Sequence, residues 1–381
     1  MEFVATAYHC AGTFRIMNQR IQLLFFVLFA GLCFAQETTP DKDAINWKRA
    51  KQLYQQSQRG EALVAEDQAY LDRAKELRRQ GKGRPGGGQS RQAANQRTAP
   101  ERLNPISDMT AEDRYEGQDG GLYGGGRNQP GEELRQAAET QLAEIQPLDA
   151  EGEPATAGKI VFISISMSNA TQEFSRFKQV ADQAPEKSAN VTIVDCAQGG
   201  QAMAEWVSPD ARPWRVAMER LERANVTPNQ VQVAWVKLAN KAPGGSLKEH
   251  GAKLQSDTIE VLKNAKAKFP NLRIAYLGSR IWAGNATGGL NPEPYAYESG
   301  FVVRWLIETQ TSDEAMPLLL WGPYIWAEGE KGRKLDDLVW TREDFAGDGV
   351  HPNQSGREKV AQQLLKFVTS DPLAKSWFVS E

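Results

Sequence analysis

Apolar runs alternate with segments of helical periodicity over the last three-fifths of this chain. The runs that predict buried strands are 159–165, 191–194, 231–236, 272–277 and 316–321. Apolar residues at helical spacing predict helices over 169–181, 214–224, 247–269, 294–310 and 360–368. Strands separated by helices are typical of a parallel sheet that is covered on both faces. We therefore expect an α/β fold over residues 158–381, a three-layer sandwich with a five-stranded parallel sheet flanked by helices.

Helical spacing also predicts a small helical hairpin over residues 36–80, broken at Gly60. Its thin apolar stripe favours a solvated pair of helices, although residues 41–79 are also a candidate docking element for a partner or a surface. The segment 81–157 is rich in Gly, Gln, Arg and Asn, so we predict a flexible linker there. One further helix is predicted within this linker, over 132–145.

The N-terminus has the pattern of an export signal. Arg20 precedes the apolar run 23–32, which is too short for a comfortable membrane span. Small residues then allow cleavage before Gln36, so we expect residues 1–35 to be a signal peptide, with Met17 as an alternative start. The mature protein is expected to be periplasmic or extracellular, without a transmembrane segment.

A lipid anchor at Cys33 is the alternative to cleavage before Gln36. It is less favoured because Leu32 is bulky where a small residue is expected before a lipidated cysteine. Cleavage before Gln36 would leave Cys196 as the only cysteine and would therefore exclude an internal disulfide.

Charge and composition exclude several function classes. The formal net charge is −3 and the sequence pI is near 5.9, and no polybasic stretch is present, so a nucleic-acid partner is not expected. Hydrophobic residues make up 40% of the sequence, which is enough for a sizeable core. His and Cys are scarce and lack paired ligand spacing, so we expect neither a zinc site of the usual type nor a cofactor.

The most informative polar cluster spans 348–352 and contains Asp348 and His351. The three-residue spacing lets a carboxylate orient a histidine that acts as a general base. Beyond the extreme N-terminus, His250 and His351 are the only histidines, so imidazole chemistry near neutral pH has few candidates. Asp-Gly and His-Pro pairs also build ordinary turns before helices, and these residues alone leave both interpretations open.

A serine lies where the first predicted strand gives way to a helix. The strand 159–165 runs into Ser166, Met167 and Ser168, and helical spacing begins at Asn169. Parallel α/β sheets bind ligands at the carboxyl ends of their strands, and helix N-terminal N–H groups stabilise anions. Ser168 is therefore a candidate nucleophile, and a helix N-cap is the structural alternative.

Ser168 and the Asp348-x-x-His351 block together resemble the SGNH, or GDSL-type, hydrolase family. The resemblance implies a flavodoxin-like hydrolase fold. It also implies a catalytic triad in which Ser168 is the nucleophile, His351 is the base and Asp348 is the acid that orients the base.

Two intermediate blocks of the family also have counterparts here. Gly200, after the second strand, matches the glycine block, and Asn240, after the third strand, matches the asparagine that donates to the oxyanion. With the N–H of Ser168, these residues would form the oxyanion hole. The match is to a divergent member, because Ser166 and Met167 replace the Gly-Asp before the serine. The third block also lacks the Gly before its Asn and the Asp after it.

Side chains after the fourth and fifth strands are candidates for substrate binding. Arg280 is a candidate to hold a carboxylate or a sulfate, with an ion pair to Glu293 or Glu298 as the alternative. Aromatic faces suited to sugar rings are offered by Trp282, Tyr324 and Trp326. Core packing is the alternative for each of these rings.

These features predict an exported serine esterase that cleaves a small ester through an acyl-enzyme, with a carbohydrate acetyl ester as a candidate substrate. Two alternatives stay open. An acyltransferase would pass the same acyl-enzyme to another acceptor. A non-catalytic carbohydrate- or surface-binding module would use an SGNH-like fold without the chemistry.

Overall fold

The computed structural model describes residues 45–58, 63–79, 97–100, 102–310 and 315–380. The described residues fall into two units, one within Met1–Pro85 and the other within Gly86–Glu381. The predicted signal peptide and the alternative anchor at Cys33 lie outside the described residues. None of the helices in the described part of the chain has the length and hydrophobicity of a membrane span.

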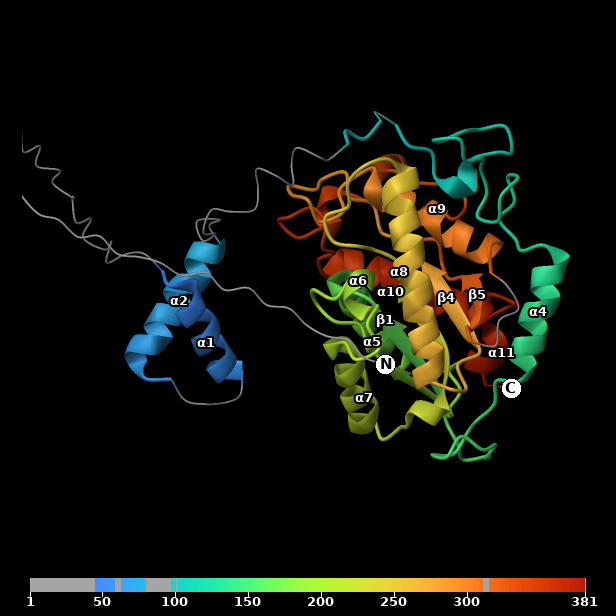
Figure 1. The fold of residues 1–381 in the computed structure, drawn as a ribbon, viewed down its shortest axis with the longest axis horizontal. Helices are drawn as coiled ribbons and strands as arrows, with labels where there is room; N and C mark the ends of the chain where they lie inside the picture. Colours follow the sequence, from blue (N-terminus) through green and yellow to red (C-terminus); the bar gives the residue numbers. More distant parts are fainter. Residues whose placement is uncertain (1–44, 59–62, 80–96, 101, 311–314, 381) are drawn as a thin grey trace, which may run out of the picture. The chain divides into compact units, whose positions relative to one another are not determined.

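In the first unit, helix α1 (Trp47–Gln58) pairs with helix α2 (Ala65–Arg79), as Figure 1 shows. The buried apolar residues of the pair are Ala50, Leu53, Leu71 and Ala74. Arg49 of α1 adds an ion pair to Asp67 of α2 at 2.8 Å. A docking role for this hairpin stays a prediction.

The second unit is built on one sheet of five parallel strands. The strands are β1 (Ile160–Ile165), β2 (Val191–Val194), β3 (Val231–Lys237), β4 (Ile274–Gly278) and β5 (Leu318–Trp321). Their spatial order is β2-β1-β3-β4-β5, the order of flavodoxin-like sheets. The strands read as apolar runs because helices bury both of their faces. The predicted fold class is confirmed.

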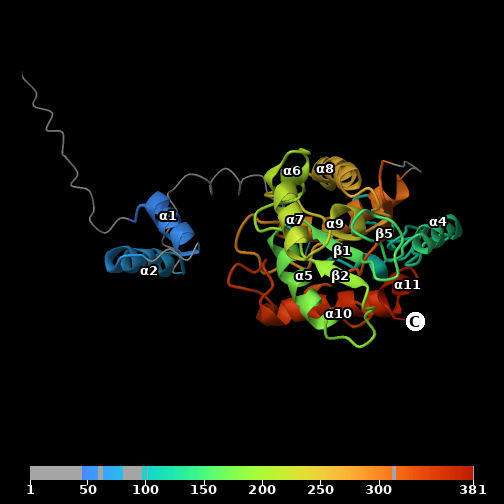
Figure 2. The same ribbon diagram turned by 90° about the horizontal axis from the view of Figure 1, so that it is seen from below.

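Helices form a layer on each face of the sheet, and Figure 2 shows α10 on one side of the strands and α7 and α8 on the other. One layer contains α5 (Ser168–Ala181), α10 (Gln354–Ser370) and α11 (Lys375–Phe378). The other contains α6 (Met203–Trp206), α7 (Arg212–Arg223), α8 (Leu247–Lys268) and α9 (Tyr295–Glu308). Alternate strand residues enter opposite cores, so Phe162 belongs to the α5 side and Val161 to the α8 side.

The prediction of a flexible linker is wrong from residue 102 onward. Leu103, Ile106 and Leu122 are buried in the core of the α8 side, and Trp321 Nε1 donates a hydrogen bond to the carbonyl of Leu122 at 2.6 Å. The segment also contains helix α4 (Glu132–Ala143) and a short 3₁₀ turn, η2 (Ile106–Asp108). The composition of this segment did not predict its packing, because its apolar residues are single and widely spaced among glycines. Each of them packs into a core that is formed mainly by the sheet and its helices.

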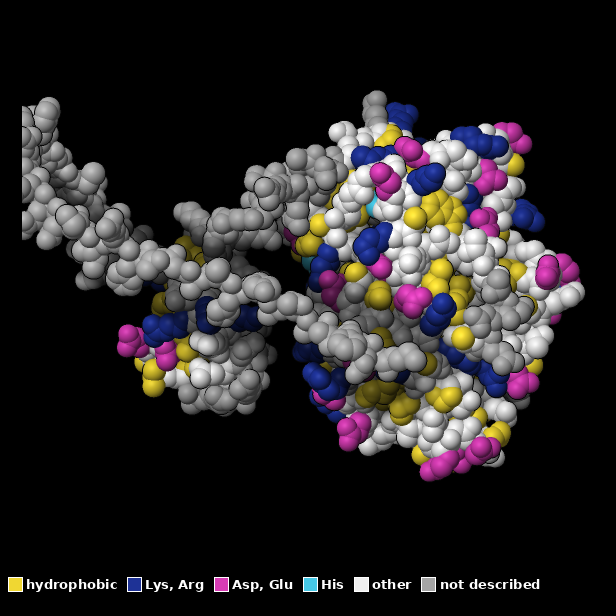
Figure 3. Space-filling model, in the orientation of Figure 1, with side chains coloured by type: hydrophobic (Ala, Val, Ile, Leu, Met, Phe, Trp, Pro, Cys, Tyr) yellow, Lys and Arg dark blue, Asp and Glu magenta, His cyan; other side chains and the backbone are white. Residues whose placement is uncertain are grey.

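Short 3₁₀ turns complete the loops of the second unit: η3 (Pro228–Gln230), η4 (Gly329–Lys331) and η5 (Arg342–Asp344). Basic and acidic side chains are interspersed over the face of this unit seen in Figure 3. That face therefore presents no extended surface of one charge sign.

Phe174 provides a test of the α5 layer. Its ring is fully buried, stacks on Trp235 and meets Phe162 edge to face. We expect Phe174→Ala to lower the free energy of unfolding by about 3–5 kcal/mol, because the cavity adds to the lost burial. Urea denaturation followed by tryptophan fluorescence measures this change. The partly exposed Val180 of the same helix is the control, and an equal loss in Val180→Ala would contradict the described core.

Candidate active site

The junction between β1 and α5 presents Ser168 at the carboxyl edge of the sheet. Ser166 has a φ of 142°, in the region that favours glycine, so the backbone is strained just before the serine. The N–H of Gln198 donates to the carbonyl of Ser166 at 2.9 Å and ties this turn to the loop after β2. No side chain caps α5, so the N–H groups of its first turn remain available beside the serine hydroxyl.

The side chains of Ser168, His351 and Asp348 form a continuous hydrogen-bonded chain. Oγ of Ser168 lies 2.7 Å from Nε2 of His351, and Nδ1 of His351 lies 2.6 Å from Oδ2 of Asp348. The backbone N–H groups of Val350 and His351 both donate to Oδ1 of Asp348 at 3.0 Å. The fold thus brings together the three residues that the sequence analysis proposed as a triad. Each of them is partly exposed to solvent.

The electrostatics of Asp348 select the imidazole tautomer. Burial alone would raise the pKa of Asp348, but the hydrogen bonds from the His351 ring and from two backbone amides outweigh it and hold that pKa well below its usual range. An ionised carboxylate only accepts hydrogen bonds, so Nδ1 of a neutral His351 carries the proton. Nε2 is then the acceptor for the Ser168 hydroxyl, as a general base requires.

The loop that carries His351 is held from two sides. Nδ2 of Asn169, the residue after the serine, donates to the carbonyl of Val350 at 2.9 Å. Gly349 has a φ of 68°, and a Cβ added there would lie 1.8 Å from the carbonyl oxygen of Asn285. Only glycine fits this approach, so the Gly in the Asp-Gly pair is required by the packing of the loop.

Asp195 anchors the helix that carries the nucleophile, a role that the sequence analysis missed. It follows β2 and accepts hydrogen bonds from Ser164 at 2.5 Å, from Ser175 at 2.7 Å and from the hydroxyl of Thr171. Burial raises the pKa of Asp195 despite these bonds. The available signal was an acid at the end of a strand, together with two hydroxyl residues one turn apart on the helix that precedes this strand.

A buried ion pair lies at the same edge of the sheet. Nζ of Lys237, the last residue of β3, lies 2.6 Å and 2.5 Å from the two carboxylate oxygens of Glu173 on α5, and neither side chain is exposed. Burial outweighs the mutual attraction of the pair, lowering the pKa of Lys237 to about 8 and raising the pKa of Glu173. The pair connects the helix of the nucleophile to the neighbouring strand.

The glycine loop that follows β2 lies next to Ser168. Ser168 is the first residue of α5, and a Cβ added to Gly199 would lie 4.0 Å from Cβ of Ser168. Gly200 follows with a φ of 75°, and its N–H donates no hydrogen bond to the described residues. The glycine loop therefore runs beside the serine, as the resemblance implies.

Asn240 is held by other partners. Its Nδ2 donates to Oδ2 of Asp257 on α8 at 2.6 Å, and its Oδ1 accepts from the N–H of Ala204 on α6 at 2.9 Å. These contacts use the amide to join two helices, and none of them supports the predicted donation to an oxyanion.

The predicted sugar-binding surface is wrong for two of its three aromatic residues. Tyr324 is 3% exposed and Trp326 is fully buried. The hydroxyl of Tyr324 accepts from the N–H of Ile106, and Nε1 of Trp326 donates to Glu293. Both rings are core residues: Tyr324 lies against Ile106, and Trp326 packs against Tyr297. Trp282 is partly exposed and packs against Phe345, so a role in substrate binding stays a prediction for this residue.

Arg280 is buried and forms neither of the ion pairs that were its structural alternative. Glu298 binds His250, Tyr115 and Arg97 instead.

Among the described residues, no group of three or more His, Cys, Asp or Glu is placed to hold a metal ion. Cys196 is also buried, and burial raises the pKa of its thiol, so it is a packing residue.

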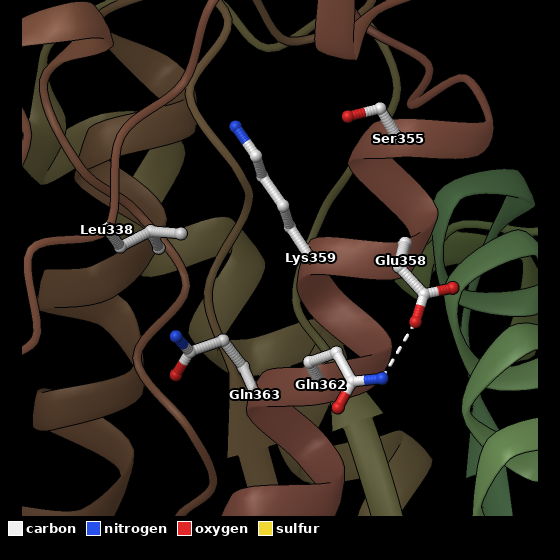
Figure 4. A pocket seen from close by; sticks show the side chains of 6 residues that line it. All are labelled: Leu338, Ser355, Glu358, Lys359, Gln362 and Gln363. Atoms are coloured by element: carbon white, nitrogen blue, oxygen red, sulfur yellow. Dashed lines mark hydrogen bonds between the residues drawn. The ribbon is translucent and has the colours of Figure 1, made fainter.

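Two surface hollows lie along α10. One is lined by Asn353, Gln354, Ser355 and Glu358, and the other, shown in Figure 4, by Leu338, Ser355, Glu358, Lys359, Gln362 and Gln363. Neither hollow includes a residue of the Ser168–His351–Asp348 chain. Lys359 donates to Asp344 at 2.6 Å, so its charge is already paired.

Comparisons with known proteins return solved structures of low identity. One is the structure of a protein from Bacteroides fragilis that is assigned as an acylhydrolase. It is 13% identical to this chain, the match covers 63% of this chain and 96% of that one, and the TM-score is 0.32. A GDSL-like lipase from Bacteroides thetaiotaomicron is 13% identical over 61% of this chain and 95% of its own, with a TM-score of 0.30. The periplasmic domain of a lipopolysaccharide acetyltransferase from Salmonella ser. Paratyphi A is 11% identical over 63% and 98%, with a TM-score of 0.31.

No family model and no curated protein matches the sequence. Residue roles in this chain therefore rest on the geometry of its own site.

The contribution of the buried Lys237–Glu173 ion pair to stability can be tested by mutation. We expect Lys237→Met to lower the free energy of unfolding by about 3–5 kcal/mol, because it leaves the Glu173 carboxylate buried without its partner. The double variant Lys237→Met/Glu173→Leu should recover most of that loss. Chemical denaturation of both variants and of Glu173→Leu alone measures the coupling. Additive losses would contradict a direct interaction.

Proposed function

We propose that this protein is an SGNH-type serine esterase that cleaves a small ester through an acyl-enzyme. The observation that carries the proposal is the continuous contact from Ser168 through His351 to Asp348. The strained turn before the serine and the uncapped N-terminus of α5 support it as well, because both features are typical of an exposed nucleophile beside anion-stabilising amides.

In the proposed reaction Oγ of Ser168 attacks the ester carbonyl while Nε2 of His351 takes the hydroxyl proton. The N–H groups of Ser168 and Gly200 stabilise the negative oxygen of the tetrahedral intermediate. The C–O bond to the alcohol then breaks, and the proton on His351 passes to the leaving oxygen. Water attacks the acyl-enzyme by the same route in reverse and releases the acid. Asp348 keeps the imidazole oriented and stabilises its charged form throughout.

Replacing the nucleophile or the base is the first test. We expect Ser168→Ala and His351→Ala each to lower kcat for a short-chain aryl ester by at least about 10⁴-fold, because the two residues act as one unit. Ser370→Ala, at the end of α10, is the matched serine control and should keep full activity. Circular dichroism establishes that the variants are folded. Full turnover by either folded variant refutes the triad.

Labelling with a fluorophosphonate separates the esterase from the binding-module alternative. The esterase should be labelled at Ser168 and should lose the label in Ser168→Ala. Saccharide binding without any labelling would instead favour the module. Analysis of products in the presence of an added alcohol acceptor distinguishes hydrolysis from acyl transfer, since the acyl-enzyme is common to both.

Asp348→Asn tests the role of the orienting carboxylate. The amide of Asn can donate to Nδ1 of His351, which moves the ring proton to Nε2 and removes the acceptor for Ser168. We expect kcat to fall by about 10³- to 10⁴-fold while the fold and the fluorescence spectrum remain unchanged. A stopped assay of the product released from a short-chain aryl ester is sensitive enough to measure this fall in kcat. A loss smaller than about 10-fold would show that Asp348 does not set the tautomer.

A further inference from the structure

Arg280 is a buried cation at the same sheet edge as Ser168. Lys237 and Gly278 are paired in register at the ends of β3 and β4, and Arg280 follows Gly278 by two residues. Because β1 and β4 are both neighbours of β3, the residues after these strands share one edge of the sheet. Arg280 is only 2% exposed.

The loop that begins at Arg280 also reaches the catalytic loop. Five residues on, Asn285 packs against Gly349, and the N–H of Thr287 donates to the carbonyl of Asp348 at 3.0 Å. Burial lowers the pKa of Arg280 to about 10, while the charges of Glu173, Glu293 and Asp348 act in the opposite direction. The guanidinium therefore stays charged near neutral pH and lies within the electrostatic field of the triad's carboxylate.

The carboxylates around Arg280 are all engaged by other donors. Glu173 binds Lys237, and Asp348 binds His351. Glu293 accepts hydrogen bonds from the N–H groups of Ala283 and Tyr297 and from Nε1 of Trp326. None of these acids forms an ion pair or a hydrogen bond with the guanidinium of Arg280.

The guanidinium itself has no partner among the described residues. Its Nε is buried without a hydrogen bond, and the groups that shift its pKa act through burial and charge, without a hydrogen bond to the guanidinium. Nε of Arg304 is also buried without a hydrogen bond, but the other buried arginines of this unit have ion-pair partners. Arg304 pairs with Asp119 at 2.9 Å, and Arg333 pairs with Asp336 at 2.6 Å, and both also donate to backbone carbonyls. A buried, unpaired charge is costly, so a retained one is expected to have a ligand.

We propose that Arg280 anchors an anion subsite beside the triad and binds a carboxylate group of the substrate. A guanidinium offers two parallel N–H donors that match a carboxylate, and a ligand carboxylate would supply the acceptors that the protein does not. The inference rests on the proposed esterase function and narrows its substrates to esters that carry a carboxylate on the acyl or the alcohol part.

The test compares matched neutral and charged esters with the full-length protein. The acyl-side pair is para-nitrophenyl butyrate and mono-para-nitrophenyl glutarate, and the alcohol-side pair is phenyl acetate and para-acetoxybenzoate. In the wild type we expect kcat/KM to favour the charged ester in at least one pair. In Arg280→Gln the ratio of charged to neutral kcat/KM should fall by about 10- to 100-fold, the range expected for a hydrogen bond to a charged group.

Two further variants make the result specific. Arg280→Lys keeps the charge without the two-pronged geometry and should give an intermediate ratio. Arg273→Gln removes the same charge next to the opposite end of β4, where Arg273 faces Glu144 at 3.8 Å, and should leave the ratio unchanged. An unchanged ratio in Arg280→Gln, or an equal loss on the neutral and charged esters of both pairs, overturns the subsite.

Failure of the proposed function gives a different result. In that case the wild type hydrolyses neither member of either pair, and the subsite is then judged by binding alone. Glutarate should raise the Tm of the wild type and not that of Arg280→Gln. The same Tm shift in both proteins, or none in either, overturns the subsite without reference to catalysis.

Discussion

The hydrogen bond between Oγ of Ser168 and Nε2 of His351 joins two segments that are 183 residues apart, and the candidate chemistry depends on it. The serine begins α5, and the histidine lies just before α10. These helices pack on the same face of the sheet, and Arg176 of α5 pairs with Glu358 of α10 at 2.5 Å. The position of the imidazole over the serine is therefore a consequence of how two helices pack, and local sequence alone does not determine it.

Buried polar groups hold the nucleophile's helix in place. Ser166, two residues before the nucleophile, has a strained φ. Asp195 binds hydroxyl groups on α5, and Glu173 of the same helix binds Lys237 of β3. Because such groups are costly to bury unless they are paired, they fix one arrangement of α5 relative to β2 and β3. That arrangement sets the direction of the serine hydroxyl.

The sequence was sufficient to predict features that depend on local pattern. The five strands are apolar runs, and Asp348 and His351 are close enough in sequence for one turn to join them. Features that depend on distant partners could not be predicted. The amide of Asn240 binds Asp257, and Tyr324 is buried because Ile106, from a glycine-rich segment, lies against it. In each case a residue far away in sequence decides what the side chain does.

The most direct test of the central claim is to trap the covalent intermediate. The full-length protein would be mixed with an aryl acetate, quenched in acid within the first turnover and digested for mass spectrometry. The account predicts one acetyl group on the peptide that contains Ser168, and on that serine within the peptide. An acetyl group on another residue, or rapid release of the aryl alcohol with no acetylated peptide, would contradict it.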